Sequence, residues 1–309
     1  MTKIKMKTLG AFMIAGLVLP AASALAAQSY DSHALVLKNV TGTVHVRTAK
    51  VAAISVDIDD GAGVIDAPKV SLRGGVVLVR GEKYRHVNCT VRNHKVRLSV
   101  ARFGIGKKHA LADFPKITVT MPEGSSLKIT GGRVFGEAGD VAQANVQING
   151  CGNFTLGAIA GDLDTQINGS GDFITGAVGG KADVQLNGSG DMTIADVSGE
   201  ADAQVNGSGD LNLGAVNSSL DAQINGSGNI HVASVNGSVD AGINGSGDIV
   251  IKGGTATPFH ASIIGSGDVA FHGHANGVDA RVTGSGDITM ASYEGEFHAS
   301  KHGVHVTNE

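Results

Sequence analysis

A five-residue motif recurs through the second half of the chain at an almost constant spacing, and it restricts the possible folds more than any other feature. It reads Asn-Gly-Cys-Gly-Asn from Asn149 and Asn-Gly-Ser-Gly-Asp from Asn168. Further copies begin at Asn187, Asn206, Asn225 and Asn244, and degenerate copies begin at Ile264 and Thr283. Successive copies lie 19 residues apart, except for one interval of 20. A fixed short period indicates a solenoid, in which each repeat contacts only its neighbours.

The segment 220–238 shows what one period can form. Leu220, Ala222 and Ile224 alternate with polar residues, which is the pattern of a half-buried strand. The Asn-Gly-Ser-Gly stretch that follows can adopt backbone angles that residues with a Cβ avoid, so we expect a corner there. A second short alternation follows at residues 230–232. Two or three short strands with their corners make one coil of a β-helix, whereas a helical repeat would need a longer period.

We therefore predict an all-β protein, a single-stranded right-handed parallel β-helix with 19-residue coils. The right-handed sense follows because crossovers between parallel strands almost always take it. Equivalent residues of successive coils should stack about 4.8 Å apart. The predicted inward columns are Ile148, Ile167, Leu186, Val205, Ile224, Ile243, Ile263, Val282; Phe154, Phe173, Met192, Leu211, Ile230, Ile249, Val269, Ile288; and Ala203, Ala222, Ala241, Ala261, Ala280.

The part before the repeats has strand-like segments without the motif. Alternating apolar residues at 35–37, 44–46, 76–79 and 117–120 are separated by turns that contain Gly or Pro. We expect residues 27–135 to form earlier, irregular and basic coils, continuous with the regular acidic coils of residues 136–309. A separate small β-sandwich is the alternative.

The first 26 residues have the features of a secretion signal. Lys3, Lys5 and Lys7 precede an apolar stretch from Leu9 to Leu19, and Ala24-Leu25-Ala26 fits a cleavage site. The apolar stretch is short for a bilayer span. We expect export to the periplasm, the cell surface or the medium, and we do not expect an integral membrane protein.

Charge is distributed unevenly along the chain. Residues 28–135 carry 17 Lys and Arg against 8 Asp and Glu, whereas residues 136–309 carry 4 against 20. Such an asymmetry bears on partners and solubility rather than on the fold. The basic half lacks interleaved aromatic residues, so we expect no nucleic-acid partner.

Two cysteines, Cys89 and Cys151, remain after the signal segment. Export makes a disulfide chemically reasonable. Their separation of 62 residues would correspond to about three regular coils, too far for a bond, but longer early coils would bring them closer. The spacing leaves a disulfide and two unpaired thiols both open.

The repeats resemble a bacterial family known as "putative auto-transporter adhesin, head GIN domain". The residues that carry the resemblance are Gly242-Ile-Asn-Gly-Ser-Gly-Asp248 with its copies, together with the segment 114–125 that leads to the repeats. The resemblance covers essentially the whole mature chain. It implies a right-handed β-helix on an exported protein in the role of a surface adhesin, and it brings no catalytic residues. Residues after the last coil contain no run of amphipathic strands, which places self-transport in doubt.

Carboxylates form two predicted columns on the outside of the coils. One contains Asp172, Asp191, Asp210, Asn229, Asp248, Asp268 and Asp287; the other contains Asp164, Asp183, Asp202, Asp221, Asp240, His260, Asp279 and His298. The six Asp residues of the first column are candidates for bridging by a divalent cation such as Ca²⁺. Turn chemistry is the simpler explanation, because Asp and Asn beside Gly often accept hydrogen bonds from the backbone amides of their own turn. The column from Asn149 to Asn244 should likewise form a ladder of side-chain amides.

No other pattern indicates chemistry. Successive carboxylates resemble the acid and base of a polysaccharide-cleaving enzyme, but no coil differs from its neighbours or adds a loop that would shape a cleft. The late histidines should lie in a line rather than converge on a metal. We expect no catalytic residues, no resident metal and no cofactor.

Three functions follow from these observations. The first is a non-enzymatic, adhesin-like binding protein of the bacterial cell envelope, whose partner is a glycan, an envelope component or a protein. The second is a periplasmic structural or envelope-stress component without a ligand. The third is a polysaccharide-active enzyme.

Overall fold

The structure is a computed structural model, and it describes residues 28–307 except 85, 93–94, 102–105 and 301. The expected signal segment, residues 1–26, lies outside the described residues. In the described part of the chain no helix has the length and apolar character needed to cross a bilayer.

Strands account for almost all of the regular structure. The first part contains β1 (Gln28–Tyr30), β2 (Ala34–Ala49), β3 (Ile54–Asp59), β4 (Lys69–Arg73), β5 (Val76–Arg80), β6 (His86–Arg92), β7 (Lys95–Ala101), β8 (Lys108–Ala110), the 3-10 helix η1 (Leu111–Asp113) and β9 (Lys116–Pro122). The coils contain β10 (Ser126–Ala138), β11 (Gln143–Gly150), β12 (Asn153–Leu156), β13 (Leu163–Gly169), β14 (Asp172–Thr175), β15 (Ala182–Gly188), β16 (Met192–Ile194), β17 (Ala201–Gly207), β18 (Leu211–Val216), β19 (Leu220–Gly226), β20 (Ile230–Gly245), β21 (Ile249–Ile251), β22 (Gly254–Gly265), β23 (Val269–Gly284), β24 (Ile288–Ala299) and β25 (Val304–Val306).

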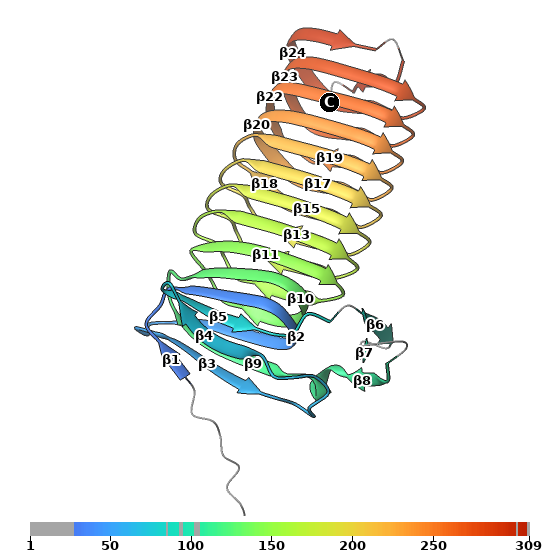
Figure 1. Cartoon of the computed structure of the whole chain (residues 1–309). Coiled ribbons are helices and arrows are strands. Elements are labelled where there is room, and N and C mark those ends of the chain that lie inside the picture. Colours follow the sequence, from blue (N-terminus) through green and yellow to red (C-terminus); the bar gives the residue numbers. More distant parts are fainter. Residues whose placement is uncertain (1–27, 85, 93–94, 102–105, 301, 308–309) are drawn as a thin grey trace, which may run out of the picture.

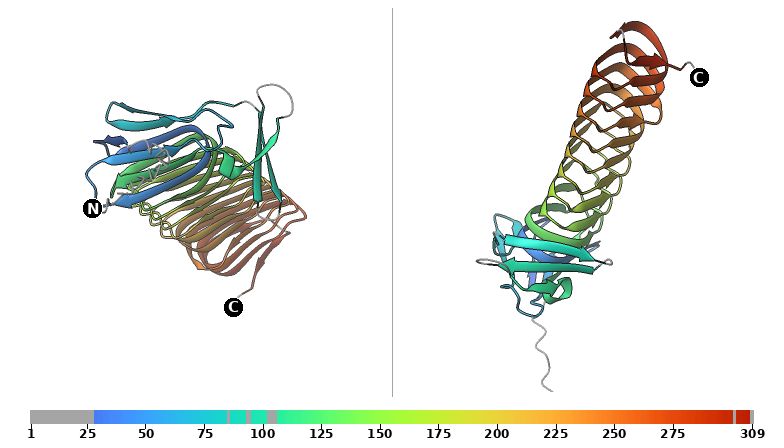
Figure 2. Two further views of the ribbon diagram at one scale, coloured as in Figure 1. Left: turned by 90° about the horizontal axis from the view of Figure 1, so that it is seen from below. Right: turned by 90° about the vertical axis from the view of Figure 1, so that its right-hand side faces the viewer.

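From β10 onward the chain winds into a β-helical rod, as predicted (Figure 1). Parallel partners are one period apart, so that Ile148 pairs with Ile167 and Ile167 pairs with Leu186. In Figure 1 the chain rises from base to tip while β11, β13 and β15 on the near side run from left to right, which is the right-handed sense. The view along the rod shows the coils superimposed into one tube (Figure 2).

Each regular coil has three sides. We call the wall that contains β11, β13, β15, β17 and β19 the first wall, and the wall that contains β12, β14, β16 and β18 the second wall. The third side is held by single bridges that join Val141, Ile159, Val178, Val197 and Val216 in turn.

The core is a column of apolar side chains inside the tube. All predicted inward residues are buried, apart from Val282 in the last part of the rod, which is half-buried. Gly169 and its equivalents in the following coils have φ between +135° and +146°. The expected corner after each Asn is therefore present, because this backbone region suits Gly and few other residues.

The base of the rod is built differently from the coils. β2 pairs in parallel with β5, β9 and β10, so its sheet is continuous with that of the coils. β4 pairs antiparallel with β5, β3 pairs antiparallel with β9, and β1 adds antiparallel to β3. Strands β6, β7 and β8 form a separate antiparallel sheet beside the base (Figure 1).

Candidate functional site

Polar side chains stand in straight rows on the outside of the first wall. The row of Asn residues is tied by hydrogen bonds in which each Nδ2 donates to the Oδ1 of the preceding coil. These distances are 3.0 Å from Asn168, 2.9 Å from Asn187, 2.9 Å from Asn206 and 3.0 Å from Asn225. The predicted amide ladder is therefore present from Asn149 to Asn225. Each bond restricts two side chains, so the row presents a regular and ordered array of amides.

A second row on the same wall consists of glutamines. Gln147 donates to Gln166 at 2.9 Å, Gln166 donates to Gln185, and Gln185 donates to Gln204 at 3.5 Å. Because side chains of a strand alternate between its faces, the Gln and Asn rows lie two residues apart on one outward surface.

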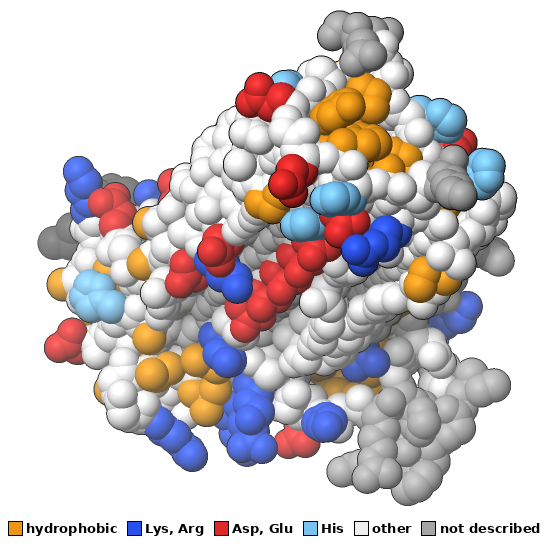
Figure 3. Space-filling view, turned by 90° about the horizontal axis from the view of Figure 1, so that it is seen from above, with side chains coloured by type: hydrophobic (Ala, Val, Ile, Leu, Met, Phe, Trp, Pro, Cys, Tyr) orange, Lys and Arg blue, Asp and Glu red, His pale blue; other side chains and the backbone are white. Residues whose placement is uncertain are grey.

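The wall-Asp row is the third row of the first wall. It consists of Asp164, Asp183, Asp202, Asp221, Asp240, His260, Asp279 and His298, which pair in register from coil to coil. Figure 3 shows acidic side chains in an unbroken strip along the rod. The histidines of this row lie in a line, as predicted.

Burial and neighbouring like charges raise the pKa of two members of this row. Burial raises the pKa of Asp183, and the charges of Asp202 and Asp164 raise it further, against a smaller opposing effect of Lys181. Burial likewise raises the pKa of Asp240, with Asp221 adding to the effect and His260 opposing it. The first wall thus carries a strongly negative line beside two neutral amide rows.

Near the base, the first wall is hollowed into a groove of about 450 Å³. Its partly exposed apolar lining consists of Ala34, Val36 and Val76, and its charged lining comprises Lys128, Asp162, Asp164, Lys181 and Asp183. Asp162 is held in place because its Oδ1 accepts a hydrogen bond from the backbone N–H of Lys181 at 2.9 Å. The groove opens at the start of the wall-Asp row. It therefore combines an apolar surface with charges of both signs.

The turn-Asp row runs from Asp172 to Asp287 and contains the candidates for bridging by a divalent cation. The backbone N–H of each later member donates to the Oδ1 of the member one coil earlier, at 2.8–3.2 Å. The row consists of Asp172, Asp191, Asp210, Asn229, Asp248, Asp268 and Asp287. Asn229 occupies the same position and makes the same bonds as its Asp neighbours. Backbone amides thus account for these side chains. The donor amide lies one coil later, whereas the sequence predicted a donor in the same turn. In the described part of the chain, no three His, Cys, Asp or Glu side chains converge as a metal site would require.

This geometry predicts that Ca²⁺ has no specific effect on stability. We expect CaCl₂ and NaCl at matched ionic strength to shift the melting temperature equally, because each row member already has a backbone donor. The double substitution Asp191→Asn and Asp210→Asn should leave that equality unchanged. A calcium-specific increase that disappears in the double variant would instead show bridging by the carboxylates.

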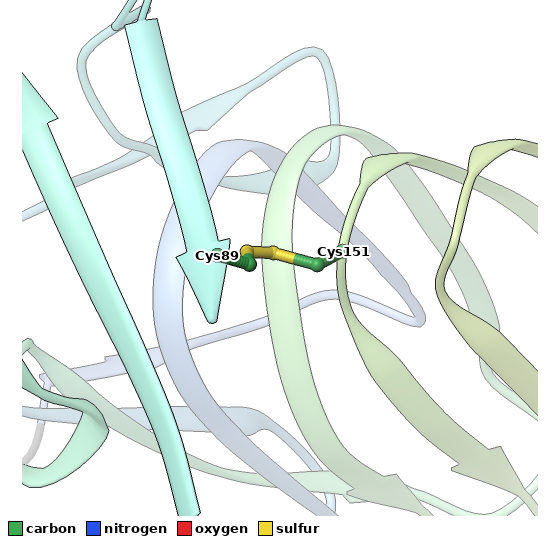
Figure 4. Close-up of a disulfide and its surroundings, with 2 residues drawn as sticks. All are labelled: Cys89 and Cys151. Carbon is green, nitrogen blue, oxygen red and sulfur yellow. A yellow bond between two sulfur atoms is a disulfide. The ribbon is translucent and has the colours of Figure 1, made fainter. Parts of the chain in front are cut away.

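Cys89 on β6 and Cys151 after β11 are joined by a disulfide, with their Cα atoms 6.2 Å apart (Figure 4). The bond fastens the separate β6–β8 sheet to the first of the regular coils. Both cysteines belong to a second apolar cluster, which also contains Leu98, Phe114 and Phe135. The sequence left this pairing open, because the separation was counted in regular coils. The antiparallel β6–β8 sheet departs from that regular winding.

Taken together, these features define the class of protein: an exclusively β solenoid whose first wall carries in-register polar rows. A profile of the family described as "Putative auto-transporter adhesin, head GIN domain" matches residues 41–235. That match spans more than half of the chain, and the chain belongs to this family.

Three of the solved structures to which this chain is similar come from two species of Parabacteroides. A "putative lipid binding protein" from P. distasonis ATCC 8503 has 15% sequence identity and a TM-score of 0.36, with 90% of this chain and 94% of that chain covered. A "putative adhesin" from P. merdae ATCC 43184 has 13% identity and a TM-score of 0.38, with 89% and 95% covered. A "putative adhesin" from P. distasonis ATCC 8503 has 13% identity and a TM-score of 0.38, with 91% and 94% covered. No curated protein sequence is significantly similar to this chain.

Proposed function

We propose that this chain is an exported, non-enzymatic binding protein of the cell envelope whose first wall binds an extended glycan. The observation that carries the proposal is the register of the Asn, Gln and Asp rows, which repeats the same polar groups along the rod. A polymer with a repeating unit can make equivalent hydrogen bonds at successive coils, and many weak contacts then act together. The bonds within the Asn row reduce the entropy lost when such a polymer binds.

The position of the groove also supports glycan binding at the first wall. The groove lies at the basal start of the wall-Asp row, where the partly exposed side chains of Ala34, Val36 and Val76 provide an apolar surface beside charged groups. Sugar rings have apolar faces and polar edges, so such a groove suits one end of a glycan chain. The signal-like residues 1–26 and the family, whose description refers to adhesins, support export and an envelope location.

A panel of immobilised polysaccharides tests this proposal. The double variant Asn187→Ala and Asn206→Ala removes two adjacent members of the Asn row, and we expect it to weaken binding about tenfold. The matched control is Thr193→Ala with Asn212→Ala, which alters outward residues of the second wall on neighbouring coils. Circular dichroism establishes that both variants are folded. Equal loss of binding in both variants, or binding of the wild type to no polysaccharide, would contradict the proposal.

One observation favours a second candidate, a polysaccharide-cleaving enzyme. Asp183 lies in the groove with a raised pKa, and Asp164 is its in-register neighbour. Two neighbouring carboxyl groups, one of which has a raised pKa, are the ingredients of glycoside hydrolysis. We expect no increase in reducing ends when the purified protein is incubated with any polysaccharide that it binds. Release that is lost in Asp183→Asn would establish the enzyme instead.

Cell fractionation distinguishes the proposed binding role from the role of a periplasmic structural component. Recovery at the cell surface or in the medium supports adhesion, whereas retention in the periplasm together with failure to bind any polysaccharide supports a structural role.

A further inference from the structure

A second groove, distinct from that of the first wall, lies at the base of the rod. It has a volume of about 810 Å³ and is formed by β4, β5 and the residues that follow β5. Its charged lining consists of Lys69, Arg73, Arg80 and Lys83 together with Asp66 and Glu82. Strands β4 and β5 lie below the first coil, at the opposite end of the rod from β24 (Figure 1). We call this second groove the basal groove.

Three cationic residues form an in-register row at this groove. Lys38 on β2 pairs with Arg80 on β5, and Arg80 pairs with Lys69 on β4. All three residues are exposed. Directly opposite side chains of neighbouring strands are close enough to interact, and like charges in that position repel each other. The base therefore holds three positive charges together at an electrostatic cost.

Nothing in the described part of the chain neutralises this row. None of Lys38, Lys69, Arg73, Arg80 and Lys83 has a carboxylate oxygen within 4.0 Å. Asp66 and Glu82 line the same groove but leave a clear excess of positive charge. An anion that enters the groove would relieve the repulsion and gain charge-assisted hydrogen bonds.

We propose that the basal groove binds a compact polyanion with two or more phosphate groups. The two arginines present planar forks suited to phosphate oxygens, and the lysines add further donors. Phosphate groups combine high charge with several acceptor oxygens, which matches this number of donors better than isolated carboxylates do. The row across three strands suits linked phosphates rather than a single ion. The proposal is independent of glycan binding, because the first wall and the basal groove share no lining residue.

Tripolyphosphate serves as the soluble probe, with the full mature chain in isothermal titration calorimetry. We expect saturable binding that weakens steeply with added NaCl. The double variant Lys69→Glu and Arg80→Glu should bind about tenfold more weakly or worse, because it reverses two adjacent members of the row. The matched control is Lys50→Glu with Lys95→Glu, which changes the net charge equally at exposed positions outside the groove. Thermal unfolding of each variant establishes that it is folded.

A second arm identifies the source of the phosphate. Co-sedimentation is measured with vesicles of phosphatidylcholine alone and with vesicles that also contain phosphatidylglycerol. Binding of tripolyphosphate and of the anionic vesicles, both lost in the groove variant, supports the proposal with a lipid headgroup as the source. Binding of tripolyphosphate alone supports it with a soluble source. Absence of tripolyphosphate binding, or equal weakening in the control variant, overturns it.

Discussion

Replacing Ile224 with Asp should destabilise the rod by about 4 kcal/mol or more and should unfold the neighbouring coils first. Ile224 is 1% exposed and stacks between Val205 and Ile243 in an inward column. A carboxylate there would lose its hydration, and the core around it contains no group to pair with it. Because each coil is stabilised by its neighbours, the damage should spread along the rod from the substituted coil. Chemical denaturation measures the free energy, and amide hydrogen exchange locates the coils that open.

Gln223 provides the control one residue earlier on the same strand. Its side chain points outward, where Nε2 donates to Asp221 Oδ1 at 2.9 Å. Replacing Gln223 with Ala should cost about 0.5 kcal/mol or less. Equal destabilisation by the two substitutions would refute the assignment of inward and outward positions.

The second large effect is expected from Gly245→Ala, which should cost roughly 2–4 kcal/mol. Gly245 has φ of +146°, a conformation that residues with a Cβ rarely adopt. An added Cβ would lie 2.0 Å from the backbone oxygen of Gly226 in the coil below. That oxygen belongs to the stacked corner and cannot move without shifting the whole coil. The free energy of unfolding by denaturant is again the measurement.

Gly253→Ala is the matched control, because the two glycines belong to adjacent turns of the same rod. A Cβ added at Gly253 would meet no atom within 4 Å. We expect a neutral or slightly stabilising effect, since Ala restricts the unfolded chain more than Gly does. If Gly253→Ala destabilises the protein as strongly as Gly245→Ala, close coil stacking is not the cause.

The regular coils could be predicted almost completely from the sequence. The period of 19 residues fixed which positions stack, and the alternation around Ile224 fixed which of them face inward. Both are local properties that repeat, so each coil supplies an independent indication of the same arrangement. The Asn row followed for the same reason, because identical side chains at equivalent positions must meet on successive coils.

The base could not be predicted to the same degree. An alternating pattern such as that of Val76–Arg80 identifies a strand but says nothing about the direction of its partner. The antiparallel pairing of β4 with β5 therefore appears only in the structure, and with it the alignment of Lys69 beside Arg80. The excess of Lys and Arg before residue 136 indicates a basic region, but the groove itself depends on this strand pairing.

The glycine-lined corners and in-register columns make the coils interchangeable, so the length of the rod can change while its fold stays the same. Val205 and Ile224 occupy equivalent positions, as do Asn206 and Asn225, so one 19-residue unit can be duplicated or removed without creating a contact of a new kind. Each such event would change the reach of the rod by about 4.8 Å while the base remained intact. Gain or loss of near-identical repeats would therefore change the length of the rod in steps of one coil. The number of coils sets the distance between the tip and the base.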